Sequence, residues 1–150
     1  MYISNYKSNA KVEVKVGMIK RCSIIIYDDF GNVLIAERGK RNERKWGIFG
    51  KEMKGKETEE KCIFKAVDKD IKCTVFDLKP FKEYNLEGED VLKVFTGSVK
   101  ECITCHKSIN GLKWIGKRNI NDYIFNDEDK MILEDYFETN DDLKGICNAL

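Results

Sequence analysis

The sequence predicts an α+β domain, in which helices pack on a mixed β-sheet. Two observations support this fold class. Short β-branched or alternating runs lie on both sides of one amphipathic helical segment, and a second helical segment follows near the end of the chain. The chain has 150 residues, 42% of them hydrophobic and 35% charged, so we expect a single domain over residues 1–150. A chain of this length buries roughly 70% of its unfolded surface.

The first part of the chain predicts three strands and a loop. The alternating run VEVKV at 12–16 and the β-branched run CSIIIYD at 22–28 each predict a strand. The turn residues DDFGN at 28–32 lead into VLIAER at 33–38, so we expect a hairpin here. The basic segment GKRNERK at 39–45 predicts a flexible loop.

A helix is predicted from about Thr58 to Asp70. Thr58 suits the N-cap, and the two glutamates that follow it suit the first turn. An apolar stripe at helical spacing predicts the buried face, with Ile63, Phe64, Val67 and Ile71.

The second half of the chain predicts more strands and a final helix. We expect strands at 73–79, 81–87, 91–99 and 112–116. NDEDKMILEDYF at 126–137 predicts a helix whose inward side chains are Met131, Ile132 and either Tyr136 or Phe137. The tail at 138–150 either adds a short helix or frays.

Charge and hydropathy exclude some classes of function. The 27 basic and 26 acidic residues are interleaved and give a net charge of +1, so there is no strong nucleic-acid signal. No run of about 18 apolar residues occurs, so no membrane span is expected. The start of the chain lacks an apolar stretch, which predicts no signal peptide and a cytoplasmic protein. Whether the chain forms a homodimer stays open.

Six cysteines are expected to be reduced, since the chain is long enough for a core of its own. Cys22, Cys62 and Cys73 lie in apolar surroundings and predict small buried side chains. Cys102, Cys105 and His106 spell C-x-x-C-H, a pattern that occurs in haem attachment, in zinc sites and in thiol redox sites. Without an export signal or a fourth soft ligand, an ordinary connection between two strands is favoured.

The stretch from Trp46 to Cys73 combines a glycine-bearing turn, an acid-rich helix start and an amphipathic helix. With VLIAER before it, this layout resembles the Nudix (MutT-like) family across residues 12–137. The resemblance implies an α/β/α sandwich with a mixed central sheet. Gly50 takes the first glycine of the W-x-x-P-G-G segment that overlaps the start of the family's box, Lys51 replaces the second, and Glu57 takes the box's isolated glutamate at the right spacing.

The rest of the box is degenerate. The three family glutamates that hold magnesium correspond to Ala66, Lys69 and Asp70, and Lys72 replaces the closing glycine. Lys65 takes the position of the family's arginine. The frame of the box is kept without a gap, but most of its carboxylates are not.

The resemblance also suggests residues that line a ligand cleft. Trp46 and Phe49 flank the cleft of the family, where Phe49 stands at the proline of W-x-x-P-G-G. Asp129 falls on a position whose Asn or Asp can hydrogen-bond a nucleobase in MutT-like members. A helix start favours Asp for its own sake, so this assignment has a simpler alternative.

For function, the resemblance implies a domain that binds, and weakly hydrolyses, nucleoside diphosphate derivatives or another phosphorylated small molecule. If it is an enzyme, Glu57 and Asp70 are the catalytic and Mg²⁺-binding candidates. A lysine in the metal cage opposes a divalent ion, so Lys69, with Lys65, is instead a candidate phosphate contact, and no cofactor is then needed. The alternative function is a non-catalytic nucleotide-sensing or protein-interaction module. The simplest alternative for Lys69 is a solvated side chain.

Overall fold

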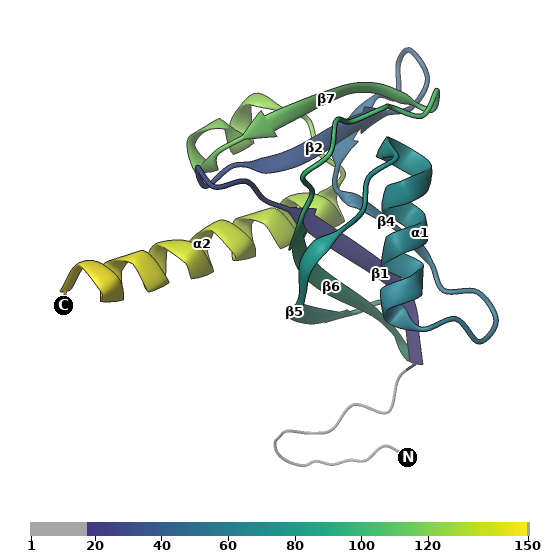
Figure 1. The fold of residues 1–150 in the computed structure, drawn as a ribbon, viewed down its shortest axis with the longest axis horizontal. Helices are drawn as coiled ribbons and strands as arrows, with labels where there is room; N and C mark the ends of the chain where they lie inside the picture. Colours follow the sequence, from purple (N-terminus) through teal and green to yellow (C-terminus); the bar gives the residue numbers. More distant parts are fainter. Residues whose placement is uncertain (1–17, 150) are drawn as a thin grey trace.

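The computed structural model describes residues 18–149, and the side chains of residues 18–140. Its helices and strands follow one another along the chain (Figure 1) as β1 (Met18–Ile26), β2 (Val33–Arg38), β3 (Lys45–Gly47), β4 (Phe49–Glu52), α1 (Glu59–Ile71), β5 (Phe76–Asn85), β6 (Asp90–Ser98), β7 (Ile109–Ile115), the 3₁₀ helix η2 (Lys117–Asp122) and α2 (Asp127–Ala149).

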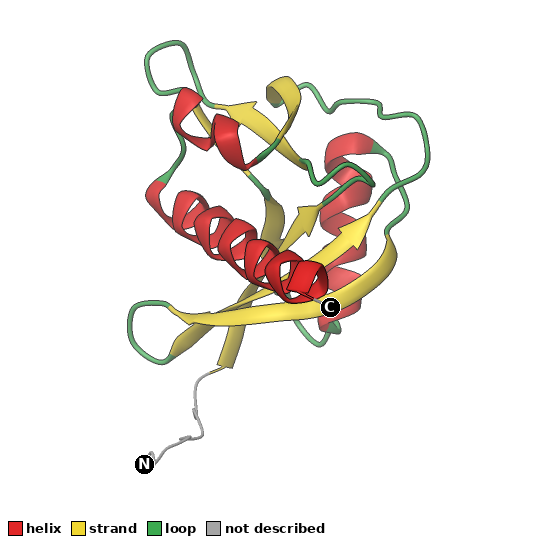
Figure 2. Cartoon of the chain, turned by 90° about the vertical axis from the view of Figure 1, so that its left-hand side faces the viewer, coloured by secondary structure: helices red, strands yellow, loops and turns green. Residues whose placement is uncertain are grey.

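The strands form two sheets. A four-stranded mixed sheet has the order β4-β1-β6-β5, in which β1 pairs with β6 in parallel and with β4 antiparallel. A three-stranded antiparallel sheet has the order β3-β2-β7. Helix α2 lies in front of the strands and α1 behind them when the molecule is turned as in Figure 2. The expected α+β sandwich of helices around a mixed sheet is therefore confirmed.

The side chains of β1 and β2 point alternately to two faces, and a hydrophobic core lies on each face. Cys22, Ile24 and Ile26 pack with the α1 side chains, whereas Ile25 packs with those of α2. Likewise, Leu34 and Ala36 of β2 belong to the α1 cluster, and its Val33 and Ile35 to the α2 cluster. Successive side chains of a strand point to opposite faces, so both strands are buried on both sides. The three cysteines predicted to be buried are indeed buried.

The expected hairpin at 28–32 is wrong in its pairing. The turn is present, because Asp28 accepts hydrogen bonds from the backbone of Phe30 and Asn32. However, the strands on either side enter different sheets, and only an isolated bridge between Tyr27 and Val33 joins them. Both flanking runs are mostly apolar, and each has buried side chains on both faces and pairs with more distant strands.

Helix α1 agrees with its prediction, except for one side chain. Thr58 caps the helix and accepts a hydrogen bond from the Lys61 amide at 3.2 Å. Phe64 was expected to be buried, but it is 43% exposed. The buried face runs instead through Cys62, Ile63, Ala66, Val67, Asp70 and Ile71.

Helix α2 is longer than predicted, because it continues through the tail to Ala149. Ile132, Leu133, Tyr136 and Phe137 are buried, whereas Met131 is 45% exposed. Within the described part of the chain, no helix combines the length and the apolar character needed to cross a membrane.

The remaining strands differ from expectation mainly in their limits. The two strands predicted at 73–79 and 81–87 form one strand, β5, whose pairing with β6 is irregular on both sides of Lys79 and Pro80. Proline has no amide to donate, and it is tolerated here because β5 is an edge strand. The strand expected at 12–16 lies outside the described residues.

Candidate functional site

A polar pocket of about 340 Å³ lies between the C-terminal half of α1 and the start of α2. Strands β1, β2 and β4 contribute to its wall, as does the loop before β7. The lining residues are Arg21, Ser23, Arg38, Ile48, Gly50, Lys69, Asp70, Ser108, Asn126 and Asp129. Three of the residues predicted from the sequence, Lys69, Asp70 and Asp129, are thus brought together.

On the α1 side of the pocket, Arg38 neutralises Asp70. The Nη2 of Arg38 donates to Oδ2 of Asp70 at 2.6 Å, and its Nη1 donates to the Ile48 carbonyl at 3.3 Å. The guanidinium also lies over the Phe49 ring, 5.4 Å from its centroid. Asp70 is buried, so it relies on this arginine to offset the cost of removing a carboxylate from water.

Lys69 supplies a second cation to this wall. Its side chain is exposed and lines the pocket next to Asp70. Among the described side chains, none forms an ion pair with Lys69 within 4 Å. An ammonium group in this position is available to an anion that enters the pocket.

The α2 side of the pocket is built on Asp129. Its Oδ2 accepts hydrogen bonds from the Ile48 amide at 2.9 Å and from Nδ2 of Asn126 at 3.1 Å. In turn, Asn126 caps the helix start by accepting from the Asp129 amide at 2.9 Å. Burial raises the pKa of Asp129 above its usual value, and these hydrogen bonds only partly oppose that shift.

Glu57 lies among lysines and does not line this pocket. Its carboxylate accepts from Nζ of Lys51 and from the Lys54 amide at 2.9 Å, and its Oε2 lies 3.0 Å from Nζ of Lys65. Hydrogen bonds from Lys51, then Lys65, hold the pKa of Glu57 at about 2. Lys65 is therefore engaged with Glu57 and not aimed at the pocket.

These residues fit a magnesium ion poorly. Among the described residues, no three His, Cys, Asp or Glu side chains converge so as to hold a metal. Both candidate ligands are already committed to cationic side chains, Asp70 to Arg38 and Glu57 to two lysines. A divalent cation has to displace these groups before it gains its carboxylate oxygens.

The two aromatic candidates are held in the core beneath and beside the site. Phe49 is fully buried, so it acts on the pocket through the guanidinium stacked on its ring. Trp46 is half-buried, and its ring contacts Tyr123 edge to face with centroids 5.1 Å apart. Its backbone forms an isolated parallel β-bridge with Phe125. Neither side chain lines the pocket.

Sequence reasoning missed Arg21, Ser23, Arg38, Ser108 and Asn126 as lining residues. Arg38 had a signal, because it ends the strand VLIAER that supported the family resemblance. Asn126 had another, because Asn immediately before a helical segment is a typical N-cap. Arg21 and Ser23 reach the pocket only through the pairing of β1 with β4, which local patterns do not predict.

The C-x-x-C-H segment forms part of the connection before β7. The amides of Thr104 and His106 donate to the carbonyls of Ile71 and Asp70 at 3.0 and 2.8 Å, which fixes this segment against the end of α1. Nδ1 of His106 lies 2.8 Å from the Ser108 hydroxyl. The segment thereby helps to place Ser108 at the pocket.

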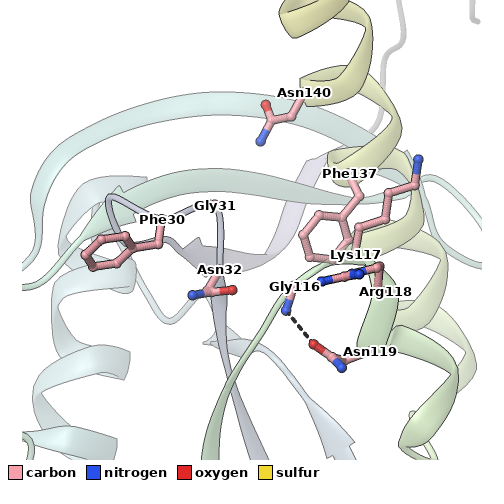
Figure 3. Close-up of a pocket in the computed structure, with 9 residues that line it drawn as sticks. All are labelled: Phe30, Gly31, Asn32, Gly116, Lys117, Arg118, Asn119, Phe137 and Asn140. Atoms are coloured by element: carbon pink, nitrogen blue, oxygen red, sulfur yellow. Dashed lines mark hydrogen bonds between the residues drawn. The ribbon is translucent and has the colours of Figure 1, made fainter.

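A second hollow, of about 310 Å³, lies between the β1–β2 turn, the start of η2 and the side of α2 (Figure 3). Lys117 and Arg118 border it together with the exposed Phe30, and the Gly116 amide donates to Asn119 at 3.2 Å. It shares no lining residue with the pocket around Asp70 and contains none of the candidate catalytic, metal-binding, phosphate-binding or cleft residues named from the sequence. The pocket around Asp70 is therefore the candidate site.

No family model matches the sequence, and no curated protein matches it either. Solved structures do. A MutT structure from work on the Aliivibrio salmonicida and Vibrio cholerae proteins is similar, with a TM-score of 0.71, 14% identity and coverage of 81% of this chain and 98% of that one.

Two further solved structures are similar at the same level. A Nudix hydrolase from Nitrosomonas europaea has a TM-score of 0.67 and 16% identity, over 81% of this chain and 72% of that one. A MutT Nudix hydrolase from Burkholderia pseudomallei has a TM-score of 0.63 and 14% identity, over 78% and 97%. The resemblance found in the sequence is thus confirmed at the level of structure: the chain has the Nudix fold.

Proposed function

We propose that this domain binds a nucleoside diphosphate derivative without a metal ion and has lost efficient hydrolysis. The observation that carries the proposal is the pairing of Asp70 with Arg38 beside the ammonium of Lys69, which has no acidic partner among residues 18–140. The pocket thus offers fixed protein cations where the family's box offers glutamates. A phosphate group entering from solvent meets Lys69 first and then the partly exposed guanidinium of Arg38.

Charge arithmetic favours binding over metal-dependent turnover. Two unit charges at 4 Å attract by about 4 kcal/mol at an effective dielectric of 20, and like charges repel by the same amount. A divalent ion next to Lys69 and Arg38 therefore meets two cations and one carboxylate that is already bound. A phosphate in the same place is attracted by both cations. Binding of a phosphate without turnover is what a sensing or regulatory module requires.

The test measures binding of a panel of nucleoside diphosphate derivatives by calorimetry, in the presence of either Mg²⁺ or a chelator. We expect equal affinity in both conditions. Lys69→Ala should weaken binding roughly 10-fold, the size of one charge-assisted hydrogen bond. Lys61→Ala is the matched control, because Lys61 is exposed on the same helix but does not line the pocket.

Hydrolysis is followed on the same panel. Binding that appears only with Mg²⁺, or turnover that disappears in Asp70→Ala, would contradict the proposal and establish a metal-dependent hydrolase. Ligand-induced stabilisation without turnover supports the binding function.

A further inference from the structure

Three sulfur-containing side chains meet in the core where α1 packs against β1 and β4 (Figure 1). Cys22 of β1 and Cys62 of α1 are fully buried, and Met53, directly after β4, packs partly buried against the same cluster. The Sγ of Cys22 donates a hydrogen bond to Sδ of Met53 at 3.6 Å. None of the three residues lines either hollow described above, so the proposed function does not account for them.

Cys62 brings the third sulfur to the same place. Its Sγ lies against the end of β4, 3.5 Å from the Lys51 carbonyl and 3.9 Å from the carbonyl of Glu52, the residue before Met53. Burial, and after it the charge of Cys62 and a hydrogen bond between the two side chains, raises the pKa of Cys22 to about 12. Cys22 thus contacts both other sulfurs, and the three side chains converge from three separate segments of the chain.

The spacing of these sulfurs suits a single metal ion. With metal–sulfur bonds of about 2.3 Å, two sulfurs on one ion lie about 3.2–4.6 Å apart for bond angles between about 90° and 180°. The 3.6 Å between Sγ of Cys22 and Sδ of Met53 falls in this range and corresponds to an angle of about 100° at the metal. The thioether already accepts from Cys22, so the acceptor side of its sulfur faces the cluster.

The types of ligand select the ion. Thiolates and thioethers are soft donors that favour Cu(I), whereas Mg²⁺ and Ca²⁺ require oxygen ligands. A structural Zn²⁺ site is almost always closed by four nitrogen, sulfur or oxygen ligands. Among the described residues, no three His, Cys, Asp or Glu side chains converge, so the third ligand of this cluster is a thioether and Cu(I) is the ion that fits it.

Binding of Cu(I) requires both thiols to lose their protons, and the charges around the cluster affect this step. Burial raises the pKa of Cys62, and the ammonium of Lys51 opposes that rise more than any other group. Lys51 and Lys93 border the thiols, paired with Glu57 and Glu59 respectively. Two thiolates and one Cu(I) carry a net charge of −1, which the adjacent Lys51 ammonium stabilises.

We propose that Cys22, Cys62 and Met53 form a buried Cu(I) site that joins α1 and the end of β4 to β1. Each thiol releases its proton to solvent as the ion binds, and the copper keeps its oxidation state. The ion enters past Met53, the one of the three side chains that solvent reaches. Ser23 lines the pocket from the opposite face of β1, so this site is separate from the ligand pocket.

The test uses fully reduced, full-length protein in which the three other thiols that bind Cu(I) most readily are removed, by Cys102→Ser, Cys105→Ser and Cys147→Ser. Cu(I) is supplied anaerobically and titrated in competition with a chromophoric chelator. We expect one ion bound per chain, with two protons released. The Tm should rise on addition of Cu(I), because the ion binds the folded state and not the unfolded chain at this site.

Variants of the cluster identify the ligands in this serine background. Cys22→Ala and Cys62→Ala should each abolish the binding of the ion. Met53→Leu nearly conserves volume, so it should fold and weaken Cu(I) binding by at least about 10-fold, the smallest cost usually seen when a group that only orients a metal ligand is removed. Cys73→Ala is the control and should bind as the background does, because Cys73 is also buried but donates to backbone carbonyls.

Stoichiometric binding that both alanine variants of the cluster lose and the control keeps would support the site. Absence of binding in the serine background would overturn the inference, and binding by wild type alone would then assign the ion to the thiols outside the cluster. Unchanged affinity in Met53→Leu would overturn the three-sulfur site even if a cysteine variant fails to fold. Each of these results leaves the proposed function standing, since that function is tested with other ligands and other variants.

Discussion

Arg38 and Asp70 meet at 2.6 Å across the floor of the pocket, one from the end of a strand and the other from the last turn of α1. The side chain of Asp70 is 12% exposed and that of Arg38 is 35% exposed, so the carboxylate is the more deeply buried partner. The loss of Arg38 and the loss of Asp70 should therefore have different effects on stability.

We expect Arg38→Met to destabilise the protein by about 1–3 kcal/mol, because it leaves a buried carboxylate without its cation. Asp70→Asn should cost less, since the remaining guanidinium reaches water. Urea unfolding at pH 7 measures both. Equal losses would show that the burial of Asp70 does not govern the energetics of the pair.

The lysine cluster around Glu57 predicts a dependence of stability on pH. The pKa of Glu57 in the folded state is about 2, below its ordinary value of 4.5, because Lys51 and Lys65 hydrogen-bond its carboxylate. A depressed pKa means that the contribution of this carboxylate is complete above pH 4.5 and is lost as the pH falls toward 2. Glu57→Gln should flatten the fall in the urea midpoint over that range.

The control for this titration is Glu60→Gln, because Glu60 is an exposed glutamate in the first turn of α1, three residues after Glu57. It should retain the wild-type slope. If Glu57→Gln and Glu60→Gln give the same profile, the contacts to Lys51 and Lys65 do not stabilise the folded state.

Parts of this architecture follow from local patterns in the sequence. Thr58 caps α1 as predicted, because the threonine and the following glutamates act within one turn. The burial of Ile63, Val67 and Ile71 likewise follows from helical periodicity. Asp70 could not be interpreted in this way, because its partner Arg38 is 32 residues away along the chain.

The pairing predicted for the hairpin at 28–32 is wrong for the same reason, because the strands that do pair are far apart along the chain. A turn at 28–32 specifies a reversal of the chain, but not which strands then pair. β1 pairs with β6, and β2 with β7, because both strands have two apolar faces that need cover. Ser23 was missed since one polar residue in the run CSIII gives no sign of which face, or which pocket, it meets.

Gly47 and Asp129 should be energetically coupled. A Cβ at Gly47 would lie 2.4 Å from Oδ2 of Asp129 and 2.8 Å from Nδ2 of Asn126. Gly47→Ala should therefore cost about 1–3 kcal/mol, as overpacking does in a well-packed site. In the background of Asp129→Ala the same change should cost clearly less, because the clashing carboxylate is gone.

A double-mutant cycle in urea measures this coupling. Gly111→Ala is the control, since the nearest atom to its Cβ, on Trp46, lies 3.7 Å away. Additive effects of Gly47→Ala and Asp129→Ala would contradict the steric account of this glycine.

The left-handed residue at the end of α1 predicts a stabilising substitution. Lys72 has φ 57° and ψ 40°, and its amide donates to the Asp68 carbonyl at 3.0 Å. The family resemblance places a glycine here, and glycine adopts this conformation without the clash that a Cβ suffers. Lys72→Gly should raise stability by about 0.5–1 kcal/mol, or roughly 1–4 °C in Tm.

Asp77, at φ 56°, provides the comparison because aspartate tolerates the left-handed region better than lysine. Asp77→Gly should therefore gain less than Lys72→Gly. Lys72→Val should lose stability, since a β-branched side chain fits this conformation worst. If Lys72→Gly lowers the Tm, the entropy that glycine gains in the unfolded chain outweighs the relief of the cap, and the strain at this position is smaller than its φ implies.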